Sequence, residues 1–252
     1  MSRDLTAGEK LKAVLHECEM RPLPGLARTM LNRIAPDPFS REGTLPDGRK
    51  VIFIHVPKTG GTSHASALGL RYGHIPVTRY LTRDEGRFRS AYSFAFKRNP
   101  WRRLYSAFNY LRAAVGINNS PDVRWAEANL ARYSSFEEFV HALEQPENAK
   151  PIMRYKHFRS QADWIAQPGS NRIEVDFLGR FENLAEETHT LSQRLGIEIE
   201  LPHLRKPQAY REELRFTPRM NEIIARLYRR DIEILGYRAP DDAGIETVAR
   251  GR

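Results

Sequence analysis

The chain has 252 residues, 40% of them hydrophobic and 28% charged, so it is long enough to bury a core without covalent cross-links. Its single cysteine, Cys18, excludes an intrachain disulfide and fits a reducing compartment, so a cytoplasmic protein is expected. No secretory signal or transmembrane segment is predicted, because no apolar run approaches the ~20 residues that span a bilayer; membrane contact is at most peripheral. Lys and Arg outnumber Asp and Glu by 40 to 31, which favours anionic partners.

The first 48 residues are expected to form a helical and loop leader. Residues 5–20 have the apolar spacing of a short helix, and residues 36–50 are rich in Pro, Gly and Asp, which predicts a loop. The main domain is predicted to span residues 49–240, with a C-terminal tail at residues 241–252. No internal repeat or low-complexity block is visible in the sequence.

Strands and helices alternate along the main domain. An apolar strand is predicted at residues 51–56, with a helix at 62–70 after it. A second strand at 93–96 leads into a helix that begins at Asn99-Pro100, an N-cap followed by a proline in the first turn. Further along, a strand at 173–179, a helix at 181–196 and a last long helix from Thr217-Pro218 are predicted. This order indicates an α/β fold with a parallel sheet, in which ligands bind at the carboxyl ends of the strands.

The first strand runs into a polar loop in residues 51–63, VIFIHVPKTGGTS. Gly60 and Gly61 permit close approach of an anion, Lys58 adds a charge, and hydroxyls follow. In the nucleotide-triphosphate loop the lysine follows the second glycine, whereas here it precedes both glycines. A glycine-containing turn that binds no ligand is the alternative interpretation of this stretch.

The second strand also ends in cationic residues, in the stretch AFKRNPWRRLYSAF. Arg98 stands at the strand end, and Ser106 lies eight residues later on the following helix. Arginine can bind a phosphate through paired donors, and the serine hydroxyl can add a further bond. The alternative is a solvated basic helix start, but two such loops at two strand ends suit a ligand with two phosphates.

Together the two loops resemble the cofactor-binding motifs of carbohydrate sulfotransferases. They are most similar to the family-2 type, which includes heparan-sulfate 2-O- and chondroitin 4-O-sulfotransferases and bacterial relatives. The resemblance continues through KHFRSQADWI, VDFLGRFENL, LPHLRKPQAY and RRDIEILGY, and so covers about residues 49–238. It implies the sulfotransferase fold, a P-loop-like central parallel sheet flanked by helices.

The resemblance also implies a co-substrate, 3′-phosphoadenosine 5′-phosphosulfate (PAPS), without a metal. Its 5′-phosphosulfate would be held by the first loop and its 3′-phosphate by Arg98 and Ser106. The expected first-loop residues are Lys58, Thr59, Gly60, Gly61, Thr62 and Ser63. Lys58 is the candidate for stabilising negative charge on the departing phosphate.

His74, in RYGHIPVTRY, is the candidate general base, because histidine titrates near neutrality. The heparan-sulfate branch has a His-x-His pair in this segment, and the first position here is Tyr72, so a single histidine carries over. His55 alternates within a strand and is expected to be a core residue. A structural role for His74 is the alternative.

The acceptor is expected to be a carbohydrate or glycolipid hydroxyl on an anionic molecule. His157, Arg159 and Gln161 are the candidate substrate-binding residues, and Arg79, Arg83 and the region 112–135 are expected on the acceptor side. Lys206 is expected near the cofactor.

Two other functions compete with this interpretation. A nucleotide-dependent phosphotransferase of related P-loop kinase-like architecture would bind ATP with magnesium, but the order of lysine and glycines disfavours it. A basic nucleic-acid-binding module would account for the net charge of +9 but not for two anion loops at strand ends. No nucleic-acid partner is therefore expected.

Overall fold

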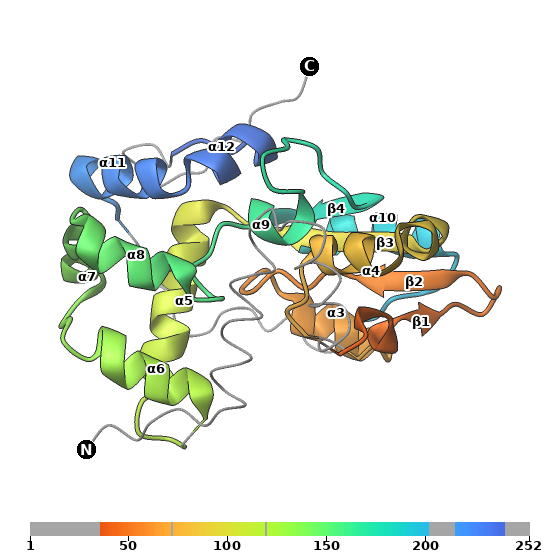
Figure 1. Ribbon diagram of the computed structural model, residues 1–252, viewed down its shortest axis with the longest axis horizontal. Coiled ribbons are helices and arrows are strands. Elements are labelled where there is room, and N and C mark those ends of the chain that lie inside the picture. Colours follow the sequence, from red (N-terminus) through yellow and green to blue (C-terminus); the bar gives the residue numbers. More distant parts are fainter. Residues whose placement is uncertain (1–35, 72, 119, 202–214, 240–252) are drawn as a thin grey trace.

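The computed structural model describes residues 36–71, 73–118, 120–201 and 215–239 (Figure 1). Its sheet has four strands in the order β1-β2-β3-β4. The short strand β1 (Gly43–Thr44) pairs antiparallel with β2 (Lys50–Phe53). Strand β3 (Tyr92–Lys97) lies parallel to β2 on one side and to β4 (Phe177–Arg180) on the other. The predicted α/β class with a mainly parallel sheet is confirmed.

Each predicted strand is present, with shifted ends. Strand β2 stops at Phe53, although the Ile54 amide still donates to the Phe94 carbonyl of β3 at 2.9 Å. Strand β4 begins at Phe177 and not at residue 173, because the chain at Ile173 forms a bridge with Ala166 and the sheet pairing starts later.

The two faces of the sheet bury different side chains, as the alternation along a strand requires. Helices α3 (Gly61–Ala67) and α10 (Leu184–Leu195) cover one face. Its strand residues are largely aromatic, namely Phe53, Phe94, Phe96 and Phe177. The other face buries aliphatic residues of β2 and β3 under α4 (Val77–Ser90), α9 (Ala162–Ile165) and α12 (Arg229–Leu235).

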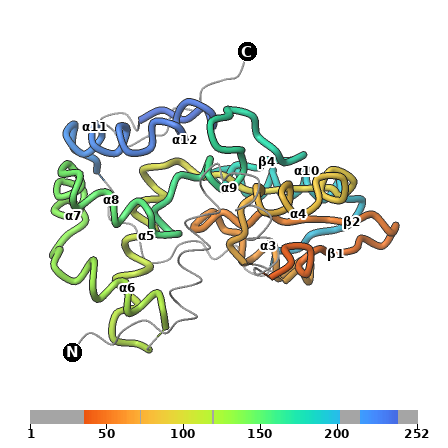
Figure 2. Tube along the Cα trace, in the orientation of Figure 1, coloured from red at the N-terminus to blue at the C-terminus, as the bar shows by residue number. Residues whose placement is uncertain are grey.

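A second core forms between helices alone. Helices α5 (Pro100–Ala114), α6 (Pro121–Leu130), α7 (Phe136–Ala142), α8 (Pro146–Arg154) and α11 (Pro218–Leu227) enclose it. We call these helices the helical half, and the sheet with its covering helices the sheet half. Figures 1 and 2 show them side by side, with α5 leading from β3 into the helical half.

The start of α5 confirms the predicted cap. The Asn99 side chain accepts hydrogen bonds from the amides of Trp101 and Arg102, and Pro100 occupies the first helical position. Trp101, Leu104, Phe108 and Leu111 lie in the helical core, as their spacing predicts. Tyr105 is half-buried beside it.

Two expectations about secondary structure need correction. The last long helix is two helices, α11 and α12, because the backbone at the buried Tyr228 leaves helical geometry (φ −109°, ψ 24°). The predicted loop at residues 36–50 contains a 3₁₀ turn, η1 (Pro38–Arg41), and β1, so the sheet extends into the expected leader. Helix α4 was not predicted. Three further expectations lie outside the described residues, namely the helix at 5–20, the tail at 241–252 and the position of Lys206.

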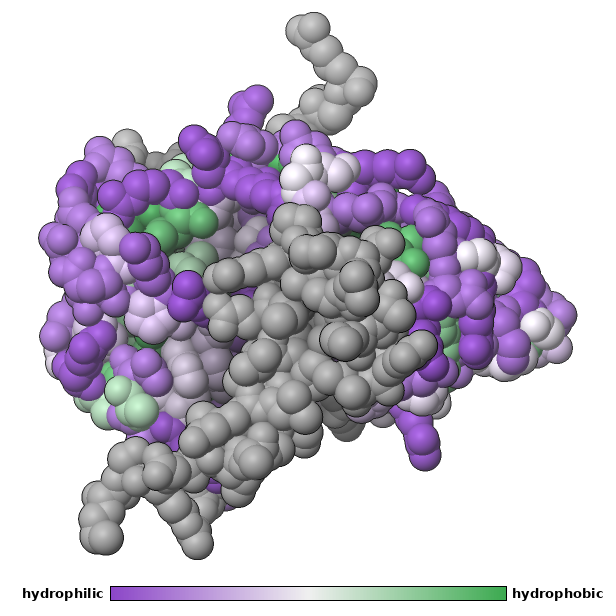
Figure 3. Space-filling model, viewed as in Figure 1, coloured by the Kyte–Doolittle hydropathy of each residue, from purple (hydrophilic) through white to green (hydrophobic). Residues whose placement is uncertain are grey.

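On the face shown in Figure 3, the visible described surface is mostly hydrophilic, with small separate apolar areas. None of the helices in the described part of the chain is long and apolar enough to cross a membrane.

Candidate active site

The loop after β2 has an unusual backbone. Lys58 has φ 70°, a left-handed conformation that costs a residue with a side chain about 1–2 kcal/mol. Gly60, with φ 78°, precedes α3 as its N-cap. The Thr59 hydroxyl donates to the Val56 carbonyl at 2.9 Å and is fully buried, so Thr59 shapes the turn. Strained backbone of this kind concentrates at functional sites.

Both glycines of the loop lie against side chains that leave no room for a Cβ atom. A Cβ on Gly61 would lie 2.3 Å from Cδ2 of His55 and 2.7 Å from Cζ of Phe53. One on Gly60 would lie 2.9 Å from Cε2 of Phe181. His55 is 5% exposed, which agrees with its expected core position. Packing therefore requires both glycines, and at Gly60 the positive φ requires one as well.

Lys58 projects from this loop toward the helical half. Its Nζ lies 3.8 Å from the centroid of the Tyr110 ring on α5, within the range of a cation–π contact. Burial, together with the nearby charge of Arg98, lowers the pKa of Lys58 to about 8. Thr62 is exposed and Ser63 half-buried in the first turn of α3.

Arg98, at the end of β3, reaches the first loop. Its guanidinium donates to the Lys58 carbonyl at 3.2 Å and lies 4.2 Å from the centroid of the Phe181 ring. Burial is the main cause that lowers the pKa of Arg98 to about 10. The structure thus brings the two predicted cationic loops together. Ser106 is half-buried on the second turn of α5.

Gln161, expected at the acceptor, is instead fully buried beneath Arg98. Its Oε1 accepts from the Arg98 amide at 2.8 Å, and its Nε2 donates to the Arg98 carbonyl at 2.7 Å. Asp231, also fully buried, accepts from the amides of Gln161 and Ala162, each at 2.9 Å. These bonds make Gln161 a residue that positions Arg98. Arg159 is 5% exposed.

Arg103 is a buried residue that the sequence analysis missed. It is fully buried, and its guanidinium donates to the carbonyls of Pro57 at 3.4 Å and His157 at 3.1 Å. It also donates to the carbonyls of Phe158 and Arg159. Arg103 therefore joins the residue before Lys58 to the segment that carries His157. Its place in a basic run at a helix start gave no sign that it would be buried.

His74 lies beside the first loop. Its Nδ1 is 3.0 Å from the His55 carbonyl oxygen, which only accepts, so Nδ1 carries the hydrogen. Burial, and then the charge of His55, lower the pKa of His74 to about 3. Its ring centroid lies 5.8 Å from that of His157.

A second histidine, His157, faces a carboxylate that the sequence analysis did not single out. Nε2 of His157 lies 3.1 Å from Oδ2 of Asp122, near the start of α6. Oδ1 of Asp122 accepts from the Tyr155 hydroxyl at 2.5 Å and from Nζ of Lys156 at 2.7 Å. Burial opposes ionisation, but the bonds from His157, Lys156 and Tyr155 hold the pKa of Asp122 well below its usual range. Nothing in the local sequence marks Asp122, because its partners follow more than 30 residues later.

Only some of the residues expected on the acceptor side lie near His157. The region 112–135 does supply Asp122. Arg79, in contrast, is buried on α4 and donates to the Pro36 carbonyl at 3.0 Å. Arg83 lies 3.9 Å from Oδ1 of Asp37. Both arginines therefore hold the segment around η1 against α4.

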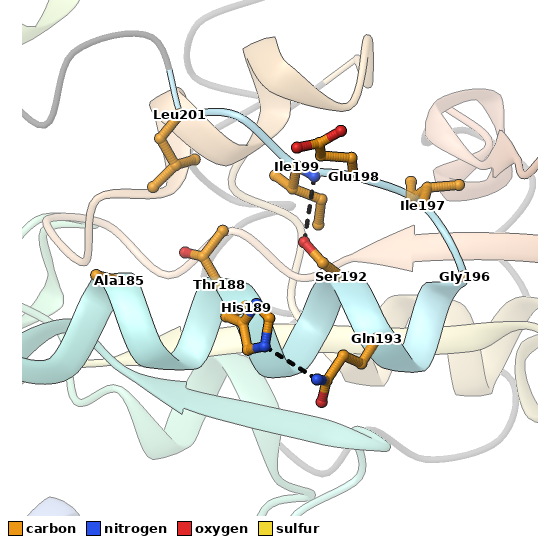
Figure 4. Close-up of a pocket in the computed structure, with 10 residues that line it drawn as sticks. All are labelled: Ala185, Thr188, His189, Ser192, Gln193, Gly196, Ile197, Glu198, Ile199 and Leu201. Carbon is orange, nitrogen blue, oxygen red and sulfur yellow. Dashed lines mark hydrogen bonds between the residues drawn. The ribbon is translucent and has the colours of Figure 1, made fainter.

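A cavity of about 620 Å³ lies elsewhere, along α10 and the chain after it (Figure 4). Its lining includes Thr188, Ser192, Ile199 and Leu201, and contains none of the candidate residues. Leu201 is the last described residue before the gap at 202–214. We therefore locate the site by its charges and backbone geometry and not by this cavity.

The described residues hold no group of three or more His, Cys, Asp or Glu side chains placed to bind a metal ion. What they do hold is a pair of cations at the carboxyl ends of β2 and β3 and, beside them, two histidines and a carboxylate. Parallel α/β proteins bind ligands at this edge of the sheet. This edge of the sheet, with its cations, histidines and carboxylate, is therefore the candidate active site.

The comparisons with known proteins identify the family. A protein-family model described as the sulfotransferase family matches residues 44–238, which include both loops and the segment of His157. The chain belongs to this family, and the predicted family and sulfotransferase fold are confirmed. Searches of curated proteins and of solved structures return no significant match.

Proposed function

We propose that this sulfotransferase transfers the sulfuryl group of PAPS to a hydroxyl of a carbohydrate or glycolipid acceptor. The observation that carries the proposal is the convergence of Lys58 and Arg98 from two adjacent strand ends, with the Arg98 guanidinium 3.2 Å from the Lys58 carbonyl oxygen. A ligand with one phosphate is held by one such loop. Two cationic loops in contact fit a ligand with two separate phosphate groups, as PAPS has.

The residues present fit such a ligand electrostatically. Burial lowers the pKa of both Lys58 and Arg98, so their charged forms are disfavoured in the free protein. Nε of Arg98 is buried and has no hydrogen-bond partner among the described residues. A phosphate at Arg98 would supply that partner, and a second anionic group at Lys58 would help to offset the cost of burying two neighbouring cations.

The roles follow from the positions. When bound, PAPS supplies a sulfuryl group whose leaving group is a phosphate. Lys58 would stabilise the negative charge that develops on that phosphate. Gly60 and Gly61 would let the backbone approach it, with the hydroxyls of Thr62 and Ser63 as further donors. Thr59 would hold the turn.

At the other end of the co-substrate, Arg98 and Ser106 would bind the 3′-phosphate, and Gln161 would keep Arg98 in position. A histidine beside Lys58 would take the proton of the acceptor. His74, the base predicted from the sequence, keeps a lone pair on Nε2, and the ring of His157 lies next to it. No metal is assigned a role.

The acceptor would approach Lys58 from the helical half. Tyr110, whose ring contacts Lys58, is 46% exposed and can pack against a sugar ring. Lys156 and His157 line the same side, which supports an anionic acceptor. A cytoplasmic location, without a nucleic-acid partner, stays our expectation from the single cysteine and from the two loops.

Thermal unfolding with adenosine 3′,5′-bisphosphate tests this proposal. At a hundred times its dissociation constant, the nucleotide should stabilise the protein by about 2.7 kcal/mol without any metal. Lys58→Ala and Arg98→Ala should each abolish most of this gain, because each removes one of the two cations. Adenosine 5′-monophosphate should give a smaller shift, since it has a single phosphate.

Arg219→Ala is the matched control, because Arg219 is an exposed arginine of α11 that pairs with Glu144 and Glu222. Its response to the bisphosphate should equal that of the unmodified protein. Stabilisation by ATP with magnesium alone would contradict the proposal and favour a phosphotransferase.

A further inference from the structure

The two histidines near Lys58, His74 and His157, differ in the group that accepts a hydrogen bond from each ring. His74 donates to a neutral backbone carbonyl, whereas His157 faces the carboxylate of Asp122. A base that takes up a proton becomes a cation, and a carboxylate behind it stabilises that cation and fixes the ring. A carbonyl does this less well, because it carries no full charge. The difference favours His157 over His74 as a proton acceptor.

The hydrogen positions of His157 follow from its partner. Asp122 is ionised, since its pKa is held well below the usual range, so its oxygens only accept. Nε2 of His157 must therefore donate, which places the lone pair of the neutral ring on Nδ1. Nδ1 is buried and has no hydrogen-bond partner in the described part of the chain. Such an acceptor needs a donor, and a hydroxyl group can supply one.

The ring of His157 lies in the candidate site. Its centroid is 5.3 Å from that of the Tyr110 ring, which is itself in contact with Nζ of Lys58. The centroid of the His74 ring is 5.8 Å away. Burial lowers the pKa of His157 and Asp122 opposes this, while the charges of Lys156 and Lys58 lower it further.

We infer that His157, oriented by Asp122, is the group that takes the proton from the acceptor hydroxyl. This inference rests on the proposed sulfuryl transfer. As the acceptor oxygen forms its bond to sulfur, its proton moves to Nδ1 of His157. The bond between sulfur and the bridging phosphate oxygen breaks, and its electron pair stays on the phosphate. The imidazolium is then paired with Asp122, whose bonds from Tyr155 and Lys156 hold it in place.

Two variants test the inference. His157→Gln should lower the transfer of label from ³⁵S-PAPS to a mixture of neutral and uronic-acid-containing oligosaccharides by about 10²–10⁴-fold. Asp122→Asn should lower it by about 10²-fold through misorientation of the ring. It should also displace the acidic limb of the pH–rate profile to lower pH, because the pKa of His157 falls without the carboxylate. A residue with a merely structural role would not move this limb.

A second readout does not depend on turnover. In ¹⁵N-histidine NMR of the full chain, the His157 signals, identified by their loss in His157→Gln, should show hydrogen on Nε2. Asp122→Asn should lower the pKa measured for this ring. Asp122→Asn also serves as the test variant if His157→Gln does not fold.

The controls separate this inference from the proposed function. His141→Gln, at a half-buried histidine of α7 that pairs with Glu137, should leave turnover unchanged. Both test variants should keep the thermal shift with adenosine 3′,5′-bisphosphate, and absence of that shift in the unmodified protein would contradict the proposed function itself. If the shift is present and His157→Gln turns over normally, or hydrogen is found on Nδ1, the inference is wrong.

Discussion

The sheet half and the helical half contribute to the candidate site in different ways. The sheet half supplies cations and close-packed backbone. Lys58, Gly60 and Gly61 lie in the loop between β2 and α3 and its junction with α3, and Arg98 directly follows β3. The helical half supplies ring and carboxylate groups, chiefly Tyr110 on α5 and Asp122 on α6, which is the element that orients His157. One half is suited to holding an anion, and the other to orienting a proton acceptor.

The difference shows how a sulfotransferase can divide its chemistry. Anion binding requires positive charge and little else, so two short loops at neighbouring strand ends suffice. Proton transfer requires a directed lone pair, and this needs a side chain held by several others. We therefore expect changes in the sheet half to affect nucleotide binding first, and changes in the helical half to affect turnover first.

A change at Arg103, which links the two halves, should cause the largest loss in the free energy of unfolding. Arg103 is fully buried and bonds to the carbonyls of Pro57 and His157, one from each side of the site. Arg103→Met would remove the donor of these carbonyls and of the Arg159 carbonyl, whereas the Phe158 carbonyl would keep its bond from the Tyr228 hydroxyl. The free energy of unfolding should fall by about 3 kcal/mol, as measured by urea denaturation.

Arg103→Met should affect the functions of both halves, because nucleotide binding and turnover should decline together. Arg132→Met is the control, because Arg132 is exposed and donates to the Asn148 side chain. Its stability should change by less than about 0.5 kcal/mol. A stable Arg103→Met protein with normal binding would show that the halves are positioned without this residue.

The same division explains which parts of the site the sequence predicted. Lys58, Gly60 and Gly61 form a pattern within four residues, and Arg98 stands at the end of the next strand. Parallel strands bring such ends together by rule, so that contact could be predicted. Short apolar segments likewise predicted β2, β3 and β4, with errors at their ends.

The helical half had no comparable local signal. Asp122 meets Tyr155 and His157, which stand 33 and 35 residues further along the chain. Such a contact depends on how α6 and the segment after α8 pack, and no spacing rule gives it. The burial of Arg103 and Gln161 was hidden for the same reason, because polar residues are expected at the surface until a structure supplies their partners.

The first loop should be sensitive to a single methyl group. A Cβ on Gly61 would lie 2.3 Å from His55 and 2.7 Å from Phe53, both buried in the sheet half. Gly61→Ala should therefore lower the free energy of unfolding by about 1–3 kcal/mol and weaken binding of adenosine 3′,5′-bisphosphate. Gly86→Ala on α4 meets nothing closer than 3.5 Å and should be neutral or stabilising by about 0.5–1 kcal/mol. If Gly61→Ala and Gly86→Ala had the same effect on the free energy of unfolding, the first loop would not be tightly packed.

The smallest expected effect is a pH dependence at Lys58. It should change the affinity for the nucleotide and the free energy of unfolding in opposite directions. Burial and Arg98 lower the pKa of Lys58 from 10.5 to about 8, so the free protein loses this charge above that pH. Bisphosphate requires the charged lysine, and its affinity in calorimetry should therefore fall above pH 8, by at most about tenfold per pH unit. The free energy of unfolding should change with the opposite sign, because the unfolded chain binds more protons at Lys58 between pH 8 and 10.5.

Affinity is the measurement that isolates Lys58, since burial also lowers the pKa of Lys97 to about 8 and this adds to the stability change. Lys58→Arg keeps the positive charge at high pH, so its affinity should stay constant from pH 7 to 9.5 even if it is weaker overall. The phosphates are already ionised in this range and do not contribute. An affinity of the unmodified protein that is equally constant would mean that Lys58 does not contact the anion, and that Arg98 alone provides the charge of the sheet half.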